Sequence, residues 1–355
     1  MKSPKKVYLE NLNKTFITTG NDKVVAVNNI NLKIKPGEFA TMLGPSGCGK
    51  TTTLRMIAGF EMPTQGKVYI GEENVATKTP DKRDTAMVFQ NYALFPHMNV
   101  FNNIAYGLKI QKRPKSEIKE RVQRILKMMK MEDFSERVPG QMSGGQQQRV
   151  SLARALVMEP GVLLFDEPLS NLDAKLRIHM RDEIRKIQQN VGITSIYVTH
   201  DQEEAMAMSD KVIIMNAGVI EQEGTPQEIY QRPVNEFVAN FIGRANIIDG
   251  EIEGISGKDA IVNIHGISYR TKAYKNFQTG QKIRAVIRPE GVIVGKQDFI
   301  VKVEKSVFMG QNQEYGVDFF GANLEISENN PTGKTIYRAG EQMGIGFEER
   351  ALHIL

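Results

Sequence analysis

Residues 44–51 read GPSGCGKT, and this stretch decides the fold of the chain. It has the form G-x-x-x-x-G-K-[ST], in which glycines let consecutive backbone N–H groups turn toward an anion. A strand pattern, Phe39–Leu43, precedes the loop, and a helical pattern, Thr52–Ala58, follows it. The positive end of that helix faces the same point. The stretch therefore predicts a site for nucleotide phosphates at a strand-to-helix turn of an α/β fold, rather than a glycine-rich turn without a ligand.

Two side chains at the end of this loop have the chemistry that a nucleotide requires. Lys50 can place its charge on the β- and γ-phosphates, and the hydroxyl of Thr51 can bind Mg²⁺. We interpret Cys48 as a small filler rather than a redox switch. The residues expected to bind the nucleotide here are Gly44, Pro45, Ser46, Gly47, Cys48, Gly49, Lys50, Thr51 and Thr52.

A second motif is the apolar run Leu163–Phe165, which ends in Asp166 and Glu167. Acids at the carboxyl end of a parallel strand lie where ligands bind in such sheets. Asp166 suits Mg²⁺ coordination through water, and Glu167 can accept a proton from an attacking water. Taken alone, the pair is explained equally well as a solvated strand end. Together with the phosphate loop it predicts a nucleotide hydrolysis site.

A third motif is the turn Ser143-Gly144-Gly145, which opens a helical stretch that is apolar from Val150 to Val157. Its N–H groups and hydroxyl form a second candidate anion site. Two phosphate-binding devices in one chain would compete for a single nucleotide. A head-to-tail dimer, in which each chain completes the site of the other, is the simpler geometry.

Residues 7–240 resemble the ATP-binding cassette (ABC) ATPases, because six motifs stand in that family's order and approximate spacing. The resemblance implies a P-loop NTPase fold with a helical subdomain at about residues 91–160, and hydrolysis of ATP with Mg²⁺. Met142 departs from the family, which usually has leucine there, but this swap conserves volume. The motifs are Gly44–Thr51, Gln90, Ser143–Gln146, Leu163–Glu167, Ser170–Asp173 and His200.

The resemblance also implies roles for individual residues. Glu167 would be the catalytic base, Gln90 would sense Mg²⁺ and the water, and His200 would contact the γ-phosphate. Gln90 taken alone is a surface glutamine, and His200 could be a capping residue. Phe16 would stack on adenine, with Tyr8 as a second candidate and ordinary core packing as the alternative. The implied Mg²⁺ ligands are Thr51, Gln90 and Asp166, and the implied contacts to the partner chain's ATP are Ser143, Gly144, Gly145, Gln146 and Asp173.

Other patterns along the chain predict the remaining elements. Apolar residues spaced along one helical face predict a helix over Ser116–Met129. Thr225, Pro226 and Glu228 form a helix start, and that helix should end near Arg232. Further predicted strands are Val162–Phe165, Ser195–Thr199 and Lys211–Met215 in the first part of the chain, and Ala260–Ile264, Ile283–Ile287, Gly291–Gly295, Ile300–Val307 and Gln313–Phe319 in the second.

The short glycine-broken strands after about residue 243 predict an all-β module, a small barrel. We therefore place an ABC ATPase domain at residues 1–242 and a β-rich domain at residues 243–355. Phe241–Gly243 and Arg288–Glu290 make the second part similar to the accessory oligonucleotide-fold-like (TOBE) domain of bacterial importer ATPases. A regulatory role and a purely structural, dimer-stabilising role both remain open for it.

Composition excludes several classes of protein. The 355 residues suggest about two domains, and 41% hydrophobic residues are enough for ordinary cores. A single cysteine allows no internal disulfide, so nothing indicates an oxidising compartment. We expect neither a signal peptide nor a membrane span, because no apolar run reaches the length that either needs. The net charge of +5 is mild and lies entirely in residues 1–240, which argues against nucleic-acid binding.

The resemblance implies the ATP-hydrolysing subunit of a bacterial importer, a homodimer located peripherally at the cytoplasmic face of the inner membrane. Its expected partners are two membrane-spanning permease subunits and, indirectly, an external solute-binding protein. We expect Tyr92, Phe95, Pro96 and His97 to receive a short helix of the permease, with core packing as the alternative. Ferric iron or a polyamine is the expected cargo, with sulfate or a sugar or glycerol phosphate as alternatives. A soluble ATP-driven regulator or nucleic-acid remodeller is the rival class.

Overall fold

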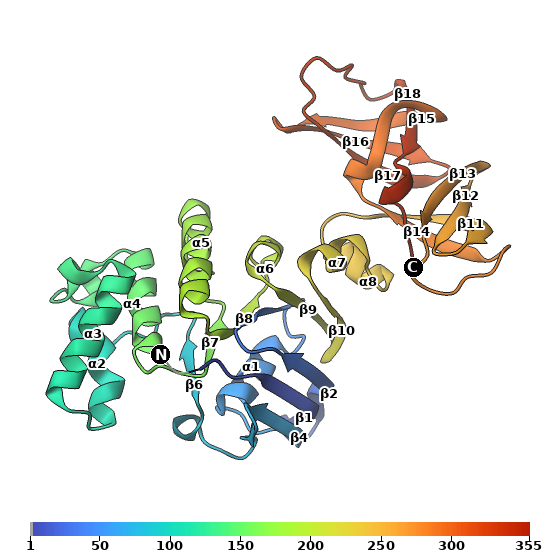
Figure 1. Ribbon diagram of the computed structural model, residues 1–355. Helices are drawn as coiled ribbons and strands as arrows, with labels where there is room; N and C mark the ends of the chain where they lie inside the picture. The colour runs from blue at the N-terminus through green and yellow to red at the C-terminus, as the bar shows by residue number, and fades with distance from the viewer. Residues whose placement is uncertain (1–2) are drawn as a thin grey trace. The chain divides into compact units, whose positions relative to one another are not determined.

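The computed structural model describes residues 3–355 (Figure 1). The chain forms two compact units that divide between Pro226 and Gln227. This division precedes the boundary expected at about residue 243. Arg288, a buried residue of the β-rich unit, contributes to this division, because its guanidinium donates to the carbonyls of Tyr230, Ala239 and Arg244 at 2.8–2.9 Å. These bonds tie the helices α7 (Pro226–Gln231) and α8 (Glu236–Phe241) to the second unit.

A six-stranded sheet with the order β10-β9-β3-β8-β7-β6 is the centre of the first unit. All neighbours pair in parallel except β10 and β9, which are antiparallel. β3, β7 and β8 are buried along their whole length, so they appear in the sequence as continuous apolar runs. The prediction of a mostly parallel sheet is confirmed. The strands are β3 (Phe39–Leu43), β6 (Thr85–Val88), β7 (Val162–Asp166), β8 (Thr194–Thr199), β9 (Lys211–Asn216) and β10 (Val219–Gly224).

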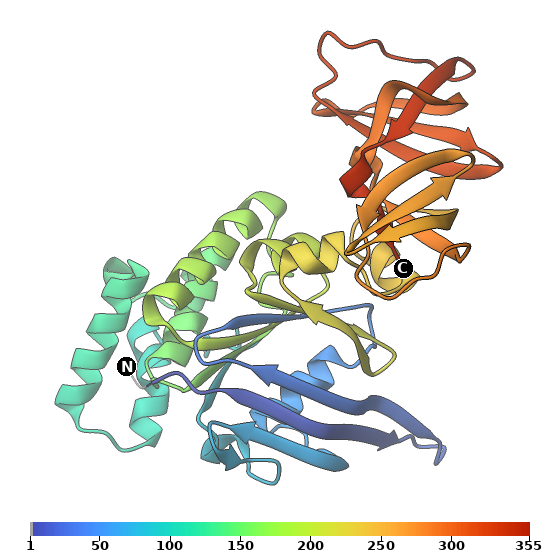
Figure 2. The same cartoon turned by 45° about the vertical axis from the view of Figure 1, so that its right-hand side comes forward.

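An antiparallel sheet that the sequence reading missed accompanies the parallel one (Figure 2). Its order is β2-β1-β4-β5, and its inward residues share one apolar core with helix α1 (Lys50–Ala58) and the parallel sheet. Its outward residues are polar or exposed, so these strands lack a continuous apolar run. The strands are β1 (Val7–Ile17), β2 (Lys23–Ile34), β4 (Gln65–Ile70) and β5 (Glu73–Asn74).

Three helices between β6 and β7 form a group of their own, drawn in cyan and green in Figure 1. They are α2 (Val100–Ile110), α3 (Lys115–Met129) and α4 (Gly144–Leu156). The helix predicted over Ser116–Met129 corresponds to α3 within one residue. A further apolar cluster joins these helices to β7, β8 and α5. The other helices of this unit are α5 (Ala174–Val191) and α6 (Gln202–Met208), and its short 3₁₀ turns are η1 (Pro80–Lys82), η2 (Glu132–Phe134) and η3 (Pro139–Gln141).

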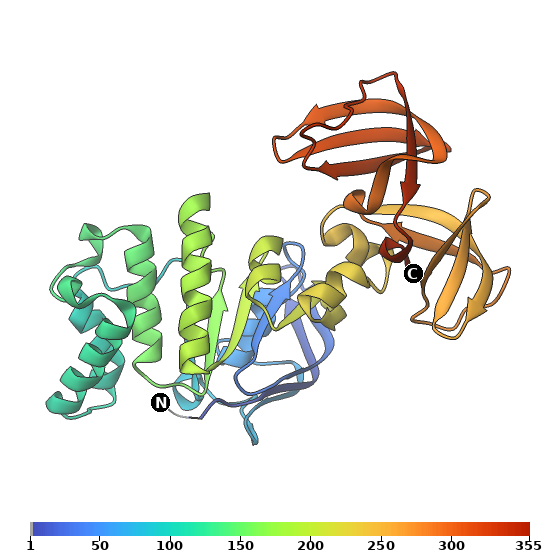
Figure 3. The same ribbon diagram turned by 45° about the horizontal axis from the view of Figure 1, so that its top comes forward.

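From Asn246 onward the second unit consists of strands and short 3₁₀ turns, which confirms the prediction of an all-β module that follows the cassette. Its strands, expected as one small barrel, pair as two sheets that share a single apolar core (Figure 3). One sheet has the order β13-β12-β11-β14-β19 and the other β17-β16-β15-β18. The strands are β11 (Asn246–Ser256), β12 (Asp259–Ile264), β13 (Ile267–Lys272), β14 (Lys282–Ile287), β15 (Val292–Phe308), β16 (Asn312–Phe319), β17 (Ala322–Asn329), β18 (Gln342–Phe347) and β19 (His353–Ile354), with 3₁₀ turns η4 (Pro289–Gly291) and η5 (Glu349–Ala351).

β15 differs from the prediction of two strands at Gly291–Gly295 and Ile300–Val307. It is one strand of 17 residues, and its register against β18 shifts between Val294 and Phe299. Gly295 lies in this interval with φ at +87°. The irregularity interrupts the apolar alternation, so the sequence indicates two strands where the structure has one irregular strand.

We expect His353 to make the stability of the second unit depend on pH. Its side chain is 9% exposed, one ring nitrogen lies 3.0 Å from the carbonyl oxygen of Pro233, and burial lowers its pKa from 6.5 to about 4. Between pH 4 and pH 6.5, His353 is therefore protonated in the unfolded chain and neutral in the folded chain. We expect the free energy of unfolding to fall by about 3 kcal/mol as the pH drops from 6.5 to 4. Urea unfolding at several pH values measures this loss.

The matched control for this prediction is the exposed His265. The variant His353→Gln should lose most of the pH slope, whereas His265→Gln should retain it. Equal slopes in both variants would contradict the assignment to His353.

Candidate nucleotide-binding site

The phosphate loop lies between β3 and α1, as its sequence pattern predicts. Two of its glycines have no room for a side chain. A Cβ on Gly49 would overlap the carbonyl oxygen of Ala26, and Gly49 has φ at +101°. A Cβ on Gly44 would overlap the carbonyl oxygen of Met215. The backbones of β2 and β9 therefore require glycine at both positions, because any side chain there would collide with them.

Lys50 and Cys48 point to the inside of this loop. The Lys50 ammonium donates to the carbonyl oxygens of Gly44 at 2.7 Å and Pro45 at 2.9 Å, and only 5% of the residue is exposed. Its charge is thus held inside the loop that is predicted to bind phosphates. Cys48 is 3% exposed and belongs to the apolar core, which fits its interpretation as a small filler.

Thr51 and Asp166, which are far apart in sequence, meet at the edge of the sheet. The Thr51 hydroxyl donates to Asp166 Oδ1 at 3.3 Å. Burial raises the pKa of Asp166, and Arg55 opposes this shift. A hydroxyl and a carboxylate are the oxygen donors that Mg²⁺ prefers, so these two residues fit that ion. Gln90, the third expected ligand, is exposed and donates instead to the Ser170 hydroxyl at 3.1 Å.

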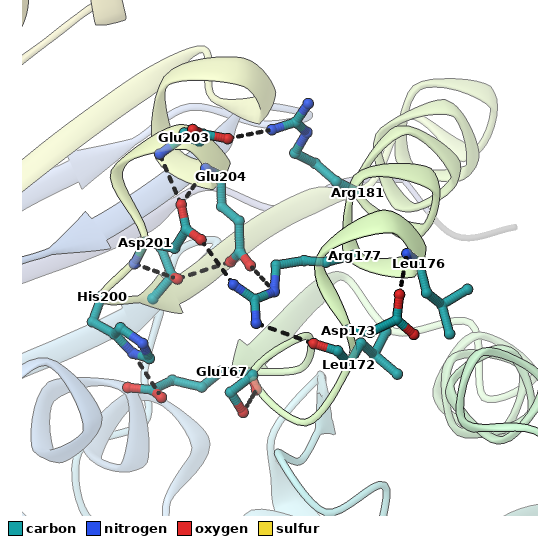
Figure 4. A network of polar contacts seen from close by, with 12 residues as sticks. Glu167, Leu172, Asp173, Leu176, Arg177, Arg181, His200, Asp201, Glu203 and Glu204 are labelled. Carbon is teal, nitrogen blue, oxygen red and sulfur yellow. Dashed lines mark hydrogen bonds and ion pairs between the residues drawn. The ribbon is translucent and has the colours of Figure 1, made fainter. Parts of the chain in front are cut away.

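Glu167 and His200 form a direct pair (Figure 4). His200 Nδ1 lies 3.1 Å from Glu167 Oε2, although 33 residues separate them in the chain. Glu167 has φ at +44°, an uncommon value outside glycine, and its N–H donates to the Val198 carbonyl at 3.0 Å. Such strain is typical of functional sites. The β7 end thus orients the Glu167 carboxylate toward His200.

A chain of hydrogen bonds connects Gln90 to this pair. Ser170 Oγ, which accepts from Gln90, donates to the Glu167 carbonyl at 3.0 Å. Asn171 Nδ2 donates back to the Gln90 carbonyl at 3.0 Å. Ser170 and Asn171 lie within the Ser170–Asp173 motif, but only the structure shows that they hold the glutamine.

The second anion motif lies at the start of α4. Ser143 is exposed and caps the helix: its hydroxyl accepts from the Gln146 N–H at 3.4 Å, and Gln146 Oε1 accepts from the Ser143 N–H at 3.0 Å. A Cβ on Gly144 would lie 3.0 Å from Leu172, and one on Gly145 would lie 3.1 Å from Leu176. The motif therefore packs closely against the start of α5, which the exposed Asp173 caps.

The structure excludes core packing for Phe16, and its stacking on adenine stays a prediction. Phe16 is 37% exposed, and the Lys14 ammonium lies 4.8 Å from its ring centroid, so it is not a core residue. It pairs with Val24 on β2, close in sequence to Ala26, which touches the phosphate loop. Tyr8 stacks instead on Tyr69, with ring centroids 5.8 Å apart.

Tyr92 is buried, although it was expected to contact a membrane subunit. It is only 8% exposed, and its carbonyl accepts from Ser151 and Arg154, both at 2.9 Å. Core packing is therefore the correct interpretation for Tyr92. Phe95 is half-buried beside Arg154, while Pro96 and His97 are exposed.

Comparisons with known proteins identify the family of the chain. The ABC transporter family matches residues 27–170, and the TOBE domain family matches residues 285–355. The chain is 42% identical to the Fe(3+) ions import ATP-binding protein FbpC of Rhizobium etli, over 98% of this chain and 97% of that protein. It is 50% identical to the spermidine/putrescine import ATP-binding protein PotA of Marinobacter nauticus, over 81% and 76%.

Solved structures resemble the cassette. One is the ATP-binding cassette MJ0796 in a dimeric post-hydrolysis state bound to ADP and Pi, with a TM-score of 0.55 and 34% identity, over 62% of this chain and 98% of that one. Another is cbiO1 of Clostridium perfringens, part of the ABC transporter complex cbiONQ, with a TM-score of 0.57 and 30% identity, over 63% and 89%.

The chain belongs to the ABC transporter family and is an ATPase. Within that family it is an importer-type ATPase subunit with a C-terminal TOBE domain. No helix within residues 3–355 has the length and apolar character needed to cross a membrane.

Proposed function

We propose that two copies of this chain close head-to-tail around two ATP molecules, and that this motion drives membrane subunits that import a solute. The observation that carries the proposal is that the two candidate anion sites lie at the starts of different helices, α1 and α4. Lys50 lies inside the phosphate loop, whereas the exposed Ser143 makes its hydrogen bonds within α4. A second copy can supply its Ser143 turn and Asp173 to the ATP in the phosphate loop of the first copy. Both the phosphate loop and the Ser143 turn of each chain then bind a nucleotide.

Within each site the residues divide the work of hydrolysis. The loop N–H groups and Lys50 bind the phosphates, and Phe16 stacks on the adenine. Thr51 and Asp166 would hold Mg²⁺, and the ion would supply positive charge beside the phosphates. Glu167 accepts the proton of the attacking water, His200 contacts the γ-phosphate, and Gln90 orients the water. Release of ADP and phosphate then reopens the dimer.

The proposed assembly contains two permease subunits and acts at the cytoplasmic face of the inner membrane. Its cargo is proposed to be ferric iron or a polyamine, because the FbpC and PotA relatives carry these cargoes in their names. The ATPase does not itself contact the cargo, so its own residues do not separate the two.

Reconstitution tests this proposal. The chain and its permeases in vesicles should hydrolyse ATP faster when the binding protein is loaded with one cargo, either ferric iron or spermidine. The Lys50→Ala variant should remove the stimulation. If no loaded binding protein stimulates hydrolysis, and the permeases do not bind the chain, the rival role as a soluble regulator replaces this one.

The exposed end of the 92–97 segment is the proposed contact with a permease. The native thiol of Cys48 is buried, so single cysteines can be introduced with little background. We expect Pro96→Cys and His97→Cys to crosslink to a permease subunit carrying a cysteine in a cytoplasmic loop. The buried position Tyr92→Cys is the matched control and should not crosslink. Absence of any crosslink from residues 96 and 97 in an active transporter would refute the contact.

A further inference from the structure

Arg177 links two segments of the site that are separate in sequence (Figure 4). It lies on α5, one turn after Asp173. Its guanidinium donates to the Leu172 carbonyl at 3.1 Å and to Asp201 Oδ2 at 3.2 Å. Leu172 immediately precedes Asp173, and Asp201 immediately follows His200. One side chain therefore touches the neighbour of a proposed dimer-contact residue and the neighbour of a proposed γ-phosphate contact.

Asp201 transmits this contact to the backbone that carries His200. Its Oδ1 accepts from the N–H groups of Glu203 at 2.8 Å and Glu204 at 3.1 Å, which caps α6. Its own N–H donates to the Thr199 hydroxyl at 3.0 Å. Both carboxylate oxygens are thus engaged, so a displacement of Arg177 would also displace the turn between β8 and α6.

The buried carboxylate of Glu204 faces the guanidinium of Arg177. Glu204 is 4% exposed, and its Oε2 accepts from the hydroxyls of Tyr197 at 2.7 Å and Thr199 at 2.8 Å. Its Oε1 lies 4.0 Å from Arg177 Nε. Burial raises the pKa of Glu204, while its hydroxyl donors oppose that shift. A buried carboxylate is costly without a facing cation, which gives Arg177 a defined position.

We propose that Arg177 is a positioning residue that makes the Leu172–Asp173 segment and the His200 turn move together. The inference rests on the proposed roles of Asp173 and His200. Dimer closure at Asp173 would then place His200 against the γ-phosphate of the ATP that is bound in the phosphate loop of the same chain. Only a planar guanidinium can donate in two fixed directions while facing a third group, and the single ammonium of lysine cannot replace it.

The test compares Arg177→Met and Arg177→Lys with Arg185→Met in the full-length chain. Arg185 is the matched control, since it lies two turns further along α5 and pairs with Asp210, away from both segments. We expect both Arg177 variants to lower kcat roughly 10- to 100-fold, the range for a misplaced catalytic group. Their affinity for ATP should stay within about twofold of the wild type, because the phosphate loop is untouched. Arg185→Met should keep the wild-type kcat.

A double variant separates positioning from folding. Arg177→Met leaves the Glu204 charge buried without a cation, and adding Glu204→Gln removes that charge. We expect the double variant to recover the melting temperature but not kcat. Recovery of kcat together with stability would show a merely structural role, and wild-type kcat in Arg177→Lys would also overturn the inference. If the wild-type chain forms no dimer in the presence of ATP, the proposed function fails instead.

Discussion

Glu167→Gln is expected to slow ATP hydrolysis by roughly 10²- to 10⁴-fold, the range for loss of a general base. Glutamine has the shape of glutamate, but its amide cannot take a proton from water. The affinity for ATP should persist, because Lys50 and the loop N–H groups are unaffected. The ATP-bound dimer should therefore accumulate. Measurements of kcat and ATP affinity, with sedimentation in the presence of ATP, test both expectations.

The control for this prediction is Glu183→Gln. Glu183 is a partly buried glutamate that pairs with Arg149 on α4 and has no contact with His200. Its replacement should leave kcat within about twofold of the wild type, because a partly exposed ion pair contributes little to stability. Near-normal turnover in Glu167→Gln would assign the base to another group.

Mixing Lys50→Ala with Ser143→Arg should restore turnover that neither variant shows alone. Lys50→Ala disables the phosphate loop of its own chain, and Ser143→Arg disables the site completed in the partner chain. In the mixed dimer both defects fall in one site, and the other site is native. With random pairing and independent sites we expect about one quarter of wild-type activity, or less if the two sites cooperate.

A mixture of Lys50→Ala with Lys50→Met is the negative control, because every site in it has a defective loop. The ATPase rate of each mixture, measured after unfolding and refolding the two chains together, gives the result. If the first mixture remains as inactive as the control, the shared-site geometry loses its support.

The cassette was predictable because its central elements leave strong local signals. β3, β7 and β8 are buried on both faces, so their sequences are continuous apolar runs bounded by the motif residues. The helix α3 has a regular apolar stripe. β1 and β2 were missed because each buries only one face and carries irregularities in register, which weaken the alternating pattern.

Local patterns were weaker guides to long-range contacts. The boundary between the units depends on Arg288 and the carbonyls of three residues 44 to 58 positions earlier. Tyr92 was expected to contact a permease helix, with core packing as the alternative, and the structure places it in a buried position where Ser151 and Arg154 bond to its carbonyl. Arg177 and Glu204 belong to no recognised pattern, so nothing in the sequence indicated their contact.

By itself, the sequence of this protein determined which chemical groups are available and at what spacing: the phosphate loop GPSGCGKT, the acids Asp166 and Glu167, and the Ser143 turn. These signals are local, since each depends on the backbone of a few consecutive residues. Only the tertiary structure decided which groups meet. The Glu167–His200 pair, the bond from Thr51 to Asp166 and the Arg177 link arise because parallel strands bring their carboxyl ends to one edge of the sheet.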